Sequence, residues 1–326
     1  MPETRLLESK HFTLEPLTEG VYACIHIQGG AAFSNAGIID LGDQTLIVDT
    51  FHTRAAGGSL RQSAEALFER SIETAMLTHA HLDHWIGACA LDARTKLFAT
   101  TTTQQVCRDM APLVWEDFQN PTLWEEMLQG TEQQLQTEQD ERVRAGHEHM
   151  RSFFRYIMAE RTEFQPRLPE RTFDDRLTFQ GSRRTAELRS LGRGHSEEDA
   201  VLLLPQDGIA FIGDIGFFGT QPQLRVCDLD HLRRQIGFIA ESGYQTLVPG
   251  HGAVGGKEAL ALQLQYIDVL EDLVGKVAHR GCSLQEAMQI ILPKPFDTWL
   301  MGGMGMFEGN VSTLFERAGG QVPEQE

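Results

Sequence analysis

Alternating apolar and polar positions divide the chain into two strand-rich regions with a polar, helix-forming segment between them. In the first region the alternation has a period of two and is broken by turn residues, which predicts an antiparallel meander from Phe12 to Thr50. A helix is expected from about Arg54 to Arg70, followed by an apolar strand, TAMLTH, that runs into a group of histidines. Strand-to-loop transitions often carry the chemistry of α/β proteins, because the strand holds the first loop residues rigidly.

Residues 103–169 have a different composition from the regions that flank them. They are rich in Gln, Glu, Arg and Met, which favours helices, and we predict a helical insertion here. Strands are expected again in TFDDRLTF, TAELRSLG, AVLLLP, GIAFIGDI and QTLVPG, with a helix around 230–241. After His251 the pattern is helical, with Gly281 as a C-cap and Ser283 at the start of a helical C-terminal extension over 283–326.

The bulk composition predicts one soluble domain over residues 1–326. A chain of this length with 41% hydrophobic residues can bury a full core, and its longest apolar runs have strand length. The net charge of −18 argues against a nucleic-acid partner. The first residues, MPETRLLESKHF, lack the features of a signal or transit peptide, and five scattered cysteines without CxxC spacing suit reduced thiols. We therefore predict a cytoplasmic protein.

The segment THAHLDH places His79, His81, Asp83 and His84 within six positions. Without a cation, so many adjacent polar groups would repel each other or stay unsatisfied, so their density predicts a metal site. Three later segments, GH, GD and PGH, each place one donor beside glycine at the end of an expected strand. The other histidines are isolated: we expect hydrogen-bonded core residues at His11, His26, His231 and His279, and solvated ones at His147 and His149.

In this order, THAHLDH, GH, GD and GH resemble the motifs of the metallo-β-lactamase superfamily over most of the chain outside the insertion. The resemblance implies an α/β fold, a four-layer αβ/βα sandwich, with the site at one edge between two sheets. It implies two divalent metal ions, zinc first, with iron or manganese also compatible with these donors. The implied ligands are His79, His81 and His195 for the first ion and Asp83, His84 and His251 for the second, with Asp214 bridging both.

Such a pair of ions predicts a hydrolase. Two metals can share a hydroxide formed near neutral pH, which is the expected nucleophile toward an ester-like bond in a small molecule: a thioester, lactone, phosphodiester or sulfate ester. Asp83 is expected to orient the hydroxide and relay its proton. An aspartate at position 214 resembles the glyoxalase II, lactonase, phosphodiesterase and sulfatase branches and sets the chain apart from zinc β-lactamases. A persulfide dioxygenase-like enzyme with one iron, a true β-lactamase and a non-catalytic protein are the alternatives.

Four aromatic residues are candidates for the substrate pocket: Phe33 in the GGAAFSN loop, Trp85 after THAHLDH, and Phe217 and Phe218 after Asp214. Packing in the core is a comparable interpretation for each of them. His52 is a further candidate, as a hydrogen-bond donor to the ligands. The insertion could cap the site, while its aromatic and Met residues, at helical spacing, could equally form its own core or a homodimer contact.

Overall fold

The computed structural model describes residues 9–299 and 305–321. The first eight residues, which carry most of the localisation prediction, lie outside the described residues. So do residues 300–304 and 322–326 of the predicted C-terminal extension. Among the described helices, none combines the length and the apolar character that crossing a bilayer requires.

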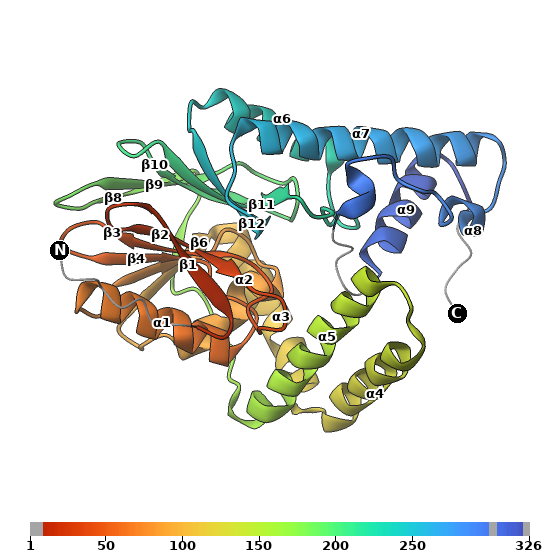
Figure 1. Cartoon of the computed structure of the whole chain (residues 1–326). Coiled ribbons are helices and arrows are strands. Elements are labelled where there is room, and N and C mark those ends of the chain that lie inside the picture. The colour runs from red at the N-terminus through yellow and green to blue at the C-terminus, as the bar shows by residue number, and fades with distance from the viewer. Residues whose placement is uncertain (1–8, 300–304, 322–326) are drawn as a thin grey trace.

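Two sheets face each other (Figure 1). The first has seven strands in chain order: β1 (Phe12–Thr18), β2 (Val21–His26), β3 (Ala36–Asp40), β4 (Thr45–Val48), β5 (Thr74–Met76), β6 (Lys96–Thr100) and β7 (Arg171–Phe173). The pairs from β1 to β4 are antiparallel, as the predicted meander requires, and those from β4 to β7 are parallel.

The second sheet has five strands in the order β12-β11-β10-β9-β8. Their bounds are β8 (Arg176–Gln180), β9 (Thr185–Ser190), β10 (Ala200–Leu204), β11 (Ile209–Phe218) and β12 (Thr246–Gly252). The β11–β12 pair is parallel, and the other pairs are antiparallel.

Helices cover the outer face of each sheet (Figure 1). On the first sheet lie α1 (Arg54–Phe68), α2 (Leu82–Trp85), η1 (Ile86–Ala90) and α3 (Thr101–Gln119). The rest of the segment predicted as an insertion forms α4 (Pro121–Thr137), α5 (Glu141–Glu160) and η2 (Arg161–Glu163), with α4 and α5 packed against each other beside the sheet. On the second sheet lie α6 (Leu229–Glu241) and α7 (Lys257–His279), and α7 is contacted in turn by α8 (Leu284–Ala287), η3 (Phe296–Thr298) and α9 (Met306–Arg317).

Three buried clusters separate these four layers. Side chains alternate across a strand, so Ile38 packs toward α1, whereas the next residue, Ile39, packs between the sheets. In the second sheet Leu202 likewise packs between the sheets, and Leu203 packs under α6 and α7. Both faces of both sheets are thus buried, and the predicted αβ/βα sandwich is confirmed.

Three details of the sequence prediction are wrong. The strand β6 was not predicted. The segment TFDDRLTF forms two strands in different sheets, because Asp174 and Asp175 end the alternation of apolar and polar residues. Thr101 Oγ1 donates to Asp174 Oδ1 at 2.6 Å, and Ser190 N donates to the Asp175 carbonyl at 2.9 Å. Asp214 lies inside β11 rather than at its end. The strand continues past it through a register shift around Gly213, whose φ of +51° suits glycine.

Asn35 joins the two sheets at the edge where the histidines gather. Its side-chain nitrogen donates to the carbonyls of Pro249 at 3.0 Å and Gly252 at 2.8 Å, and its backbone N–H donates to Gly250 at 2.7 Å. The loop before β3 therefore holds the end of β12, which carries His251.

Candidate metal centre

All seven predicted ligand positions come together at this edge, in two groups. The first contains His79, His81, His195 and Asp214, and the second contains Asp83, His84 and His251. Within each group the possible ligand atoms lie within 4.8 Å of one another. The chain brings them there from the β5–α2 connection, α2, the β9–β10 loop, β11 and β12.

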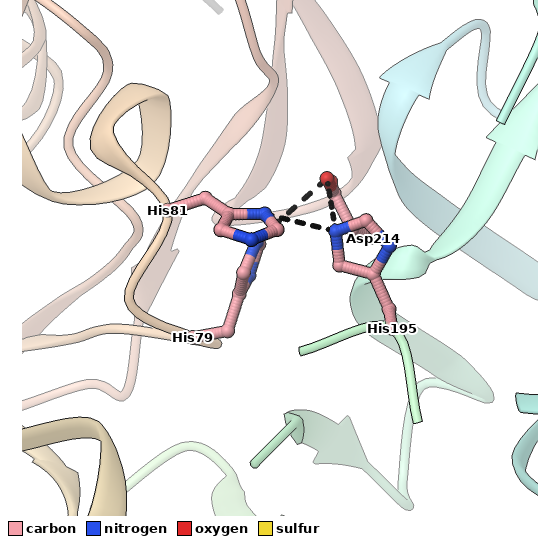
Figure 2. Close-up of side chains that lie close together, drawn as sticks. All are labelled: His79, His81, His195 and Asp214. Atoms are coloured by element: carbon pink, nitrogen blue, oxygen red, sulfur yellow. Dashed lines mark hydrogen bonds and ion pairs between the residues drawn. The ribbon is translucent and has the colours of Figure 1, made fainter. Parts of the chain in front are cut away.

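Asp214 lies at the centre of the first group (Figure 2). Its Oδ2 is 3.1 Å from His195 Nε2 and 3.7 Å from His79 Nε2. His81 Nδ1 is 2.9 Å from the same nitrogen of His195. Three imidazoles and one carboxylate oxygen thus converge on one small volume.

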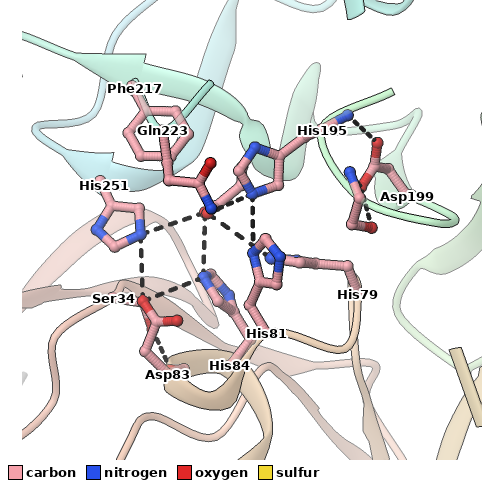
Figure 3. A network of polar contacts seen from close by, with 12 residues as sticks. Ser34, His79, His81, Asp83, His84, His195, Asp199, Phe217, Gln223 and His251 are labelled. Atoms are coloured by element: carbon pink, nitrogen blue, oxygen red, sulfur yellow. Dashed lines mark hydrogen bonds and ion pairs between the residues drawn. The ribbon is translucent and has the colours of Figure 1, made fainter. Parts of the chain in front are cut away.

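The other oxygen of Asp214 faces the second group, whose members Asp83, His84 and His251 are labelled in Figure 3. Asp214 Oδ1 is 3.0 Å from His84 Nε2 and 3.4 Å from His251 Nε2. Asp83 Oδ2 approaches the same two nitrogens, at 3.7 Å and 3.2 Å. One carboxylate therefore contacts both groups, with a different oxygen toward each.

Several of these atoms are buried without a hydrogen bond in the described structure: His79 Nε2, His84 Nε2 and Asp214 Oδ1. The 3.0 Å approach of His84 Nε2 to Asp214 Oδ1 therefore lacks hydrogen-bond geometry. Leaving buried polar atoms unpaired is costly, and a cation among them would satisfy all three. The donor set, imidazole and carboxylate, is one that zinc, iron and manganese accept.

The electrostatics of the group are set by burial and by these close charges. Burial alone would raise the pKa of Asp214, but the surrounding histidines hold it well below its ordinary value. Burial would lower the pKa of His84, but Asp214, Asp49 and Asp83 raise it well above its ordinary value. Asp214 similarly raises the pKa of His251 to about 9, against the effect of burial. The nearby carboxylates therefore favour the protonated forms of His84 and His251, and metal binding would displace these protons.

Asp49 orients His84 from the side opposite the centre. Its Oδ2 is 2.8 Å from His84 Nδ1, and its carboxylate accepts hydrogen bonds from Thr78 N and Thr78 Oγ1, both at 2.8 Å. The His84 Nδ1 proton is then directed to Asp49, which leaves Nε2 free to bind a cation. Asp49 was not among the predicted site residues, although a carboxylate directly after LIV was a usable signal.

A second buried aspartate, Asp199, fixes the loop that carries His195. It accepts hydrogen bonds from His195 N at 2.7 Å, Ser196 N at 3.0 Å and Gln235 Nε2 at 3.0 Å.

Gly250 has a steric role, since a Cβ at this position would lie 1.9 Å from Asp214 Oδ1. The glycine beside His251 was expected from the sequence, but its contact with Asp214 was not.

The four aromatic pocket candidates lie in different surroundings. Phe33 is partly exposed, and Phe217 is buried behind the ligands, with its ring stacked on His251 at 4.8 Å. Trp85 lies in the core, 1% exposed, and donates from Nε1 to the Arg167 carbonyl at 2.6 Å. Phe218 packs in the cluster under α7. Only Phe33 of these candidates is both near the centre and open to solvent.

Three further histidines gather beside the centre, and the predictions for two of them need correction. His149 is not solvated, because its ring contacts that of Phe33, with 4.4 Å between the centroids, and its Nδ1 accepts a hydrogen bond from Gly29 N at 2.9 Å. His26 is not a hydrogen-bonded core residue: its Nδ1 is buried without a partner, and its ring lies 6.3 Å from that of His251. His52 makes no described hydrogen bond to a ligand, and its ring contacts Phe33 and Phe153 instead.

Replacing Asp49 with asparagine is expected to lower metal affinity about 10- to 100-fold, the usual effect of removing the partner that orients a metal-binding histidine. The fold should persist, because the amide keeps the side-chain volume. Competition with a chromophoric chelator measures the affinity. Replacing the surface residue Asp268 with asparagine is the control, and equal affinity in the two variants would contradict the role given to Asp49.

Comparison with known proteins agrees with the fold. The sequence matches the family model of the metallo-beta-lactamase superfamily over residues 29–97, which includes THAHLDH and ends before His195. No curated protein matches the sequence significantly.

Solved structures of similar fold include metallo-β-lactamases from three bacteria. FIM-1 from Pseudomonas aeruginosa, in its mono-zinc form, has 19% identity and a TM-score of 0.54, with 78% of this chain and 94% of that chain covered. The enzyme from Hirschia baltica has 19% identity and a TM-score of 0.53, with 79% and 97% covered. That from Pontibacter korlensis has 15% identity and a TM-score of 0.56, with 78% and 99% covered. At these identities the likeness shows a shared fold.

Proposed function

We propose that this chain, whose residues 29–97 match the family model of the metallo-beta-lactamase superfamily, is a dinuclear metal-dependent hydrolase that cleaves an ester-like bond in a small molecule. The observation that carries the proposal is the position of Asp214, whose Oδ2 faces one group of donors and whose Oδ1 faces the other. A carboxylate in this position suits two neighbouring cations better than one.

The proposed ligands of the first ion are His79, His81 and His195, and those of the second are Asp83, His84 and His251, with Asp214 shared. When bound, two such ions supply a hydroxide nucleophile at neutral pH and polarise the oxygen of the substrate. Zinc suits this donor set first, and iron or manganese second.

Asp83 is the proposed proton acceptor of the site. Burial would raise its pKa, but His84 and His251 hold it well below its ordinary value, so the group is a carboxylate at neutral pH. Its side chain is 18% exposed, whereas that of Asp214 is 4% exposed. Asp83 can therefore meet both an ion and a water molecule from the solvent side, which suits transfer of a proton to the leaving group.

Two features reduce the range of substrate classes that we propose. An aspartate in the bridging position supports the esterase-like branches of the superfamily over the true β-lactamases, although the structural neighbours described above are β-lactamases. A net charge of −18 supports a small molecule over a nucleic acid. The cytoplasmic location and a homodimer stay predictions.

A panel of chromogenic substrates tests the function: a thioester, a lactone, a phosphodiester, a sulfate ester and a cephalosporin, each with zinc-loaded and with metal-free protein. We expect zinc-dependent turnover of at least one of the first four, at a higher kcat/KM than for the cephalosporin. Turnover of the cephalosporin alone would indicate a β-lactamase. A single bound iron, with oxygen consumption and no hydrolysis, would support the dioxygenase alternative.

A further inference from the structure

A surface of aromatic and imidazole rings borders the metal centre, and α5 contributes part of it. We name this surface the α5 wall and define it by five residues: His26, Phe33, His52, His149 and Phe153. His149 and Phe153 come from α5, within the segment predicted as an insertion, and the other three come from the loops and strand ends of the first sheet.

The rings form a continuous set of contacts. Phe33 lies 4.4 Å from His149 and 4.6 Å from Phe153, between ring centroids, and His52 lies 4.6 Å from Phe153. His26 connects the wall to the centre, because its ring is 6.3 Å from that of His149 and 6.3 Å from that of His251. Ser34, next to Phe33, donates to the Asp83 carbonyl at 2.5 Å.

The wall lies on the side from which solvent reaches the centre. Among the proposed ligands, His81, Asp83 and His251 are partly exposed, and the other four are buried. His251 is the one nearest His26. Four wall residues, His26, Phe33, His52 and His149, are themselves partly exposed, with Phe153 buried behind them. A substrate that reaches the ions from this side would therefore lie against the wall.

Phe33 is held in an uncommon backbone conformation, with φ of +72°. A residue with a side chain rarely adopts this region, and such outliers concentrate at functional sites. Two contacts to the same loop fix its position relative to α5: Gly29 N donates to His149 Nδ1 at 2.9 Å, and Ser152 Oγ donates to the Gly29 carbonyl at 2.6 Å. The chain thus fixes the Phe33 ring against α5 despite the backbone strain.

The wall contains no acidic, lysine or arginine side chain. Burial lowers the pKa of His52 to about 4 and that of His149 to about 4, so these two imidazoles are neutral at neutral pH. Because His149 Nδ1 accepts the Gly29 N–H, its proton is on Nε2. That Nε2–H has no partner among the described residues, so it is free to donate a hydrogen bond. The wall therefore offers flat apolar faces and a neutral donor, and no lysine or arginine for an anionic group.

We propose that the α5 wall binds an uncharged aryl group of the substrate, with Phe33 and His149 against the ring and the His149 Nε2–H donating to a polar atom beside it. On this proposal, which rests on the proposed hydrolase function, α5 determines which esters the centre accepts. Phe153 and His52 are positioning residues, because the rings of both contact that of Phe33.

Binding of benzamide, an uncharged aryl probe, tests the wall without turnover and without metal. Saturation-transfer NMR on the metal-free full-length chain gives its Kd, with acetamide as the non-aromatic comparison. We expect His149→Ala and Phe33→Asn to weaken benzamide binding about threefold to tenfold, the effect of losing one aromatic contact. Asparagine at position 33 tolerates a positive φ. His147→Ala, on the same helix and outside the wall, is the matched control and should keep the wild-type Kd.

Hydrolysis gives the second readout. In zinc-loaded protein the ratio of kcat/KM for phenyl acetate to that for methyl acetate should fall about threefold to tenfold in His149→Ala and stay at the wild-type value in His147→Ala. Equal benzamide affinity in wild type and both wall variants, or no benzamide binding to wild type, would overturn the proposal. If the wild type hydrolyses no ester, the proposed function is wrong. The benzamide measurement still tests, independently of hydrolysis, whether the α5 wall binds an aryl group. Melting curves show whether each variant is folded.

Discussion

Replacing Asp214 with asparagine is expected to lower kcat/KM about a hundredfold or more. The amide has nearly the same volume but can offer one oxygen, whereas the carboxylate presents Oδ2 to the first group and Oδ1 to the second. The variant should therefore lose at least one ion. Steady-state kinetics on the substrate found with the panel measure the loss in rate, and elemental analysis measures the metal retained.

The control for this variant is Asp268→Asn, on the surface of α7, where the side chain is 65% exposed and pairs with Arg233. It removes one negative charge without touching the centre, so its kinetics should match those of the wild type. A wild-type rate in Asp214→Asn would refute the dinuclear centre. A lower rate with both ions retained would show that Asp214 contributes to the reaction but is not needed to hold the ions.

Removing the metal with a chelator is expected to abolish hydrolysis and to destabilise the fold. The described residues supply no hydrogen bond to the buried atoms His79 Nε2, His84 Nε2 and Asp214 Oδ1, so removing the cations would leave these atoms unpaired. Zinc at a few hundred times its Kd should restore about 3 kcal/mol of unfolding free energy. Thermal melts before and after adding zinc measure this, with magnesium as the control ion. A melting temperature that does not respond to zinc would contradict the account.

The destabilisation should grow with pH in the metal-free chain. The pKa of His251 is raised from 6.5 to about 9, so its contribution to stability is complete below pH 6.5 and is lost as the pH rises through about 9. In the zinc-loaded chain the ligands are already deprotonated, and protons compete less with zinc as the pH rises. Urea denaturation from pH 6 to pH 9.5 should therefore give diverging curves for the two forms, and parallel curves would count against the ligand role of His251.

The ligands could be predicted from the sequence because each is marked within a few residues. THAHLDH places four donors directly after a strand, and glycine accompanies each of His195, Asp214 and His251. The layers could be predicted for a similar reason, since strands buried on both faces and amphipathic helices have local patterns. No long-range contact had to be known for either prediction.

The residues around the ligands could not be predicted, because their roles depend on contacts between distant segments. His149 is 120 residues from Gly29 in sequence and still accepts its N–H, and Asn35 donates to a carbonyl 217 residues away. The role of Trp85 was equally unpredictable: it follows the ligand motif directly but packs into the core, where its indole N–H donates to the Arg167 carbonyl. A residue next to a ligand in the sequence therefore need not point toward the metal centre.

The metal content of the purified chain tests the central claim most directly. Protein loaded with zinc and freed of excess ion by gel filtration should contain two zinc ions per chain by elemental analysis, and Asp214→Asn should contain fewer. One ion per wild-type chain, or none, would contradict a dinuclear centre formed by His79, His81, Asp83, His84, His195, Asp214 and His251.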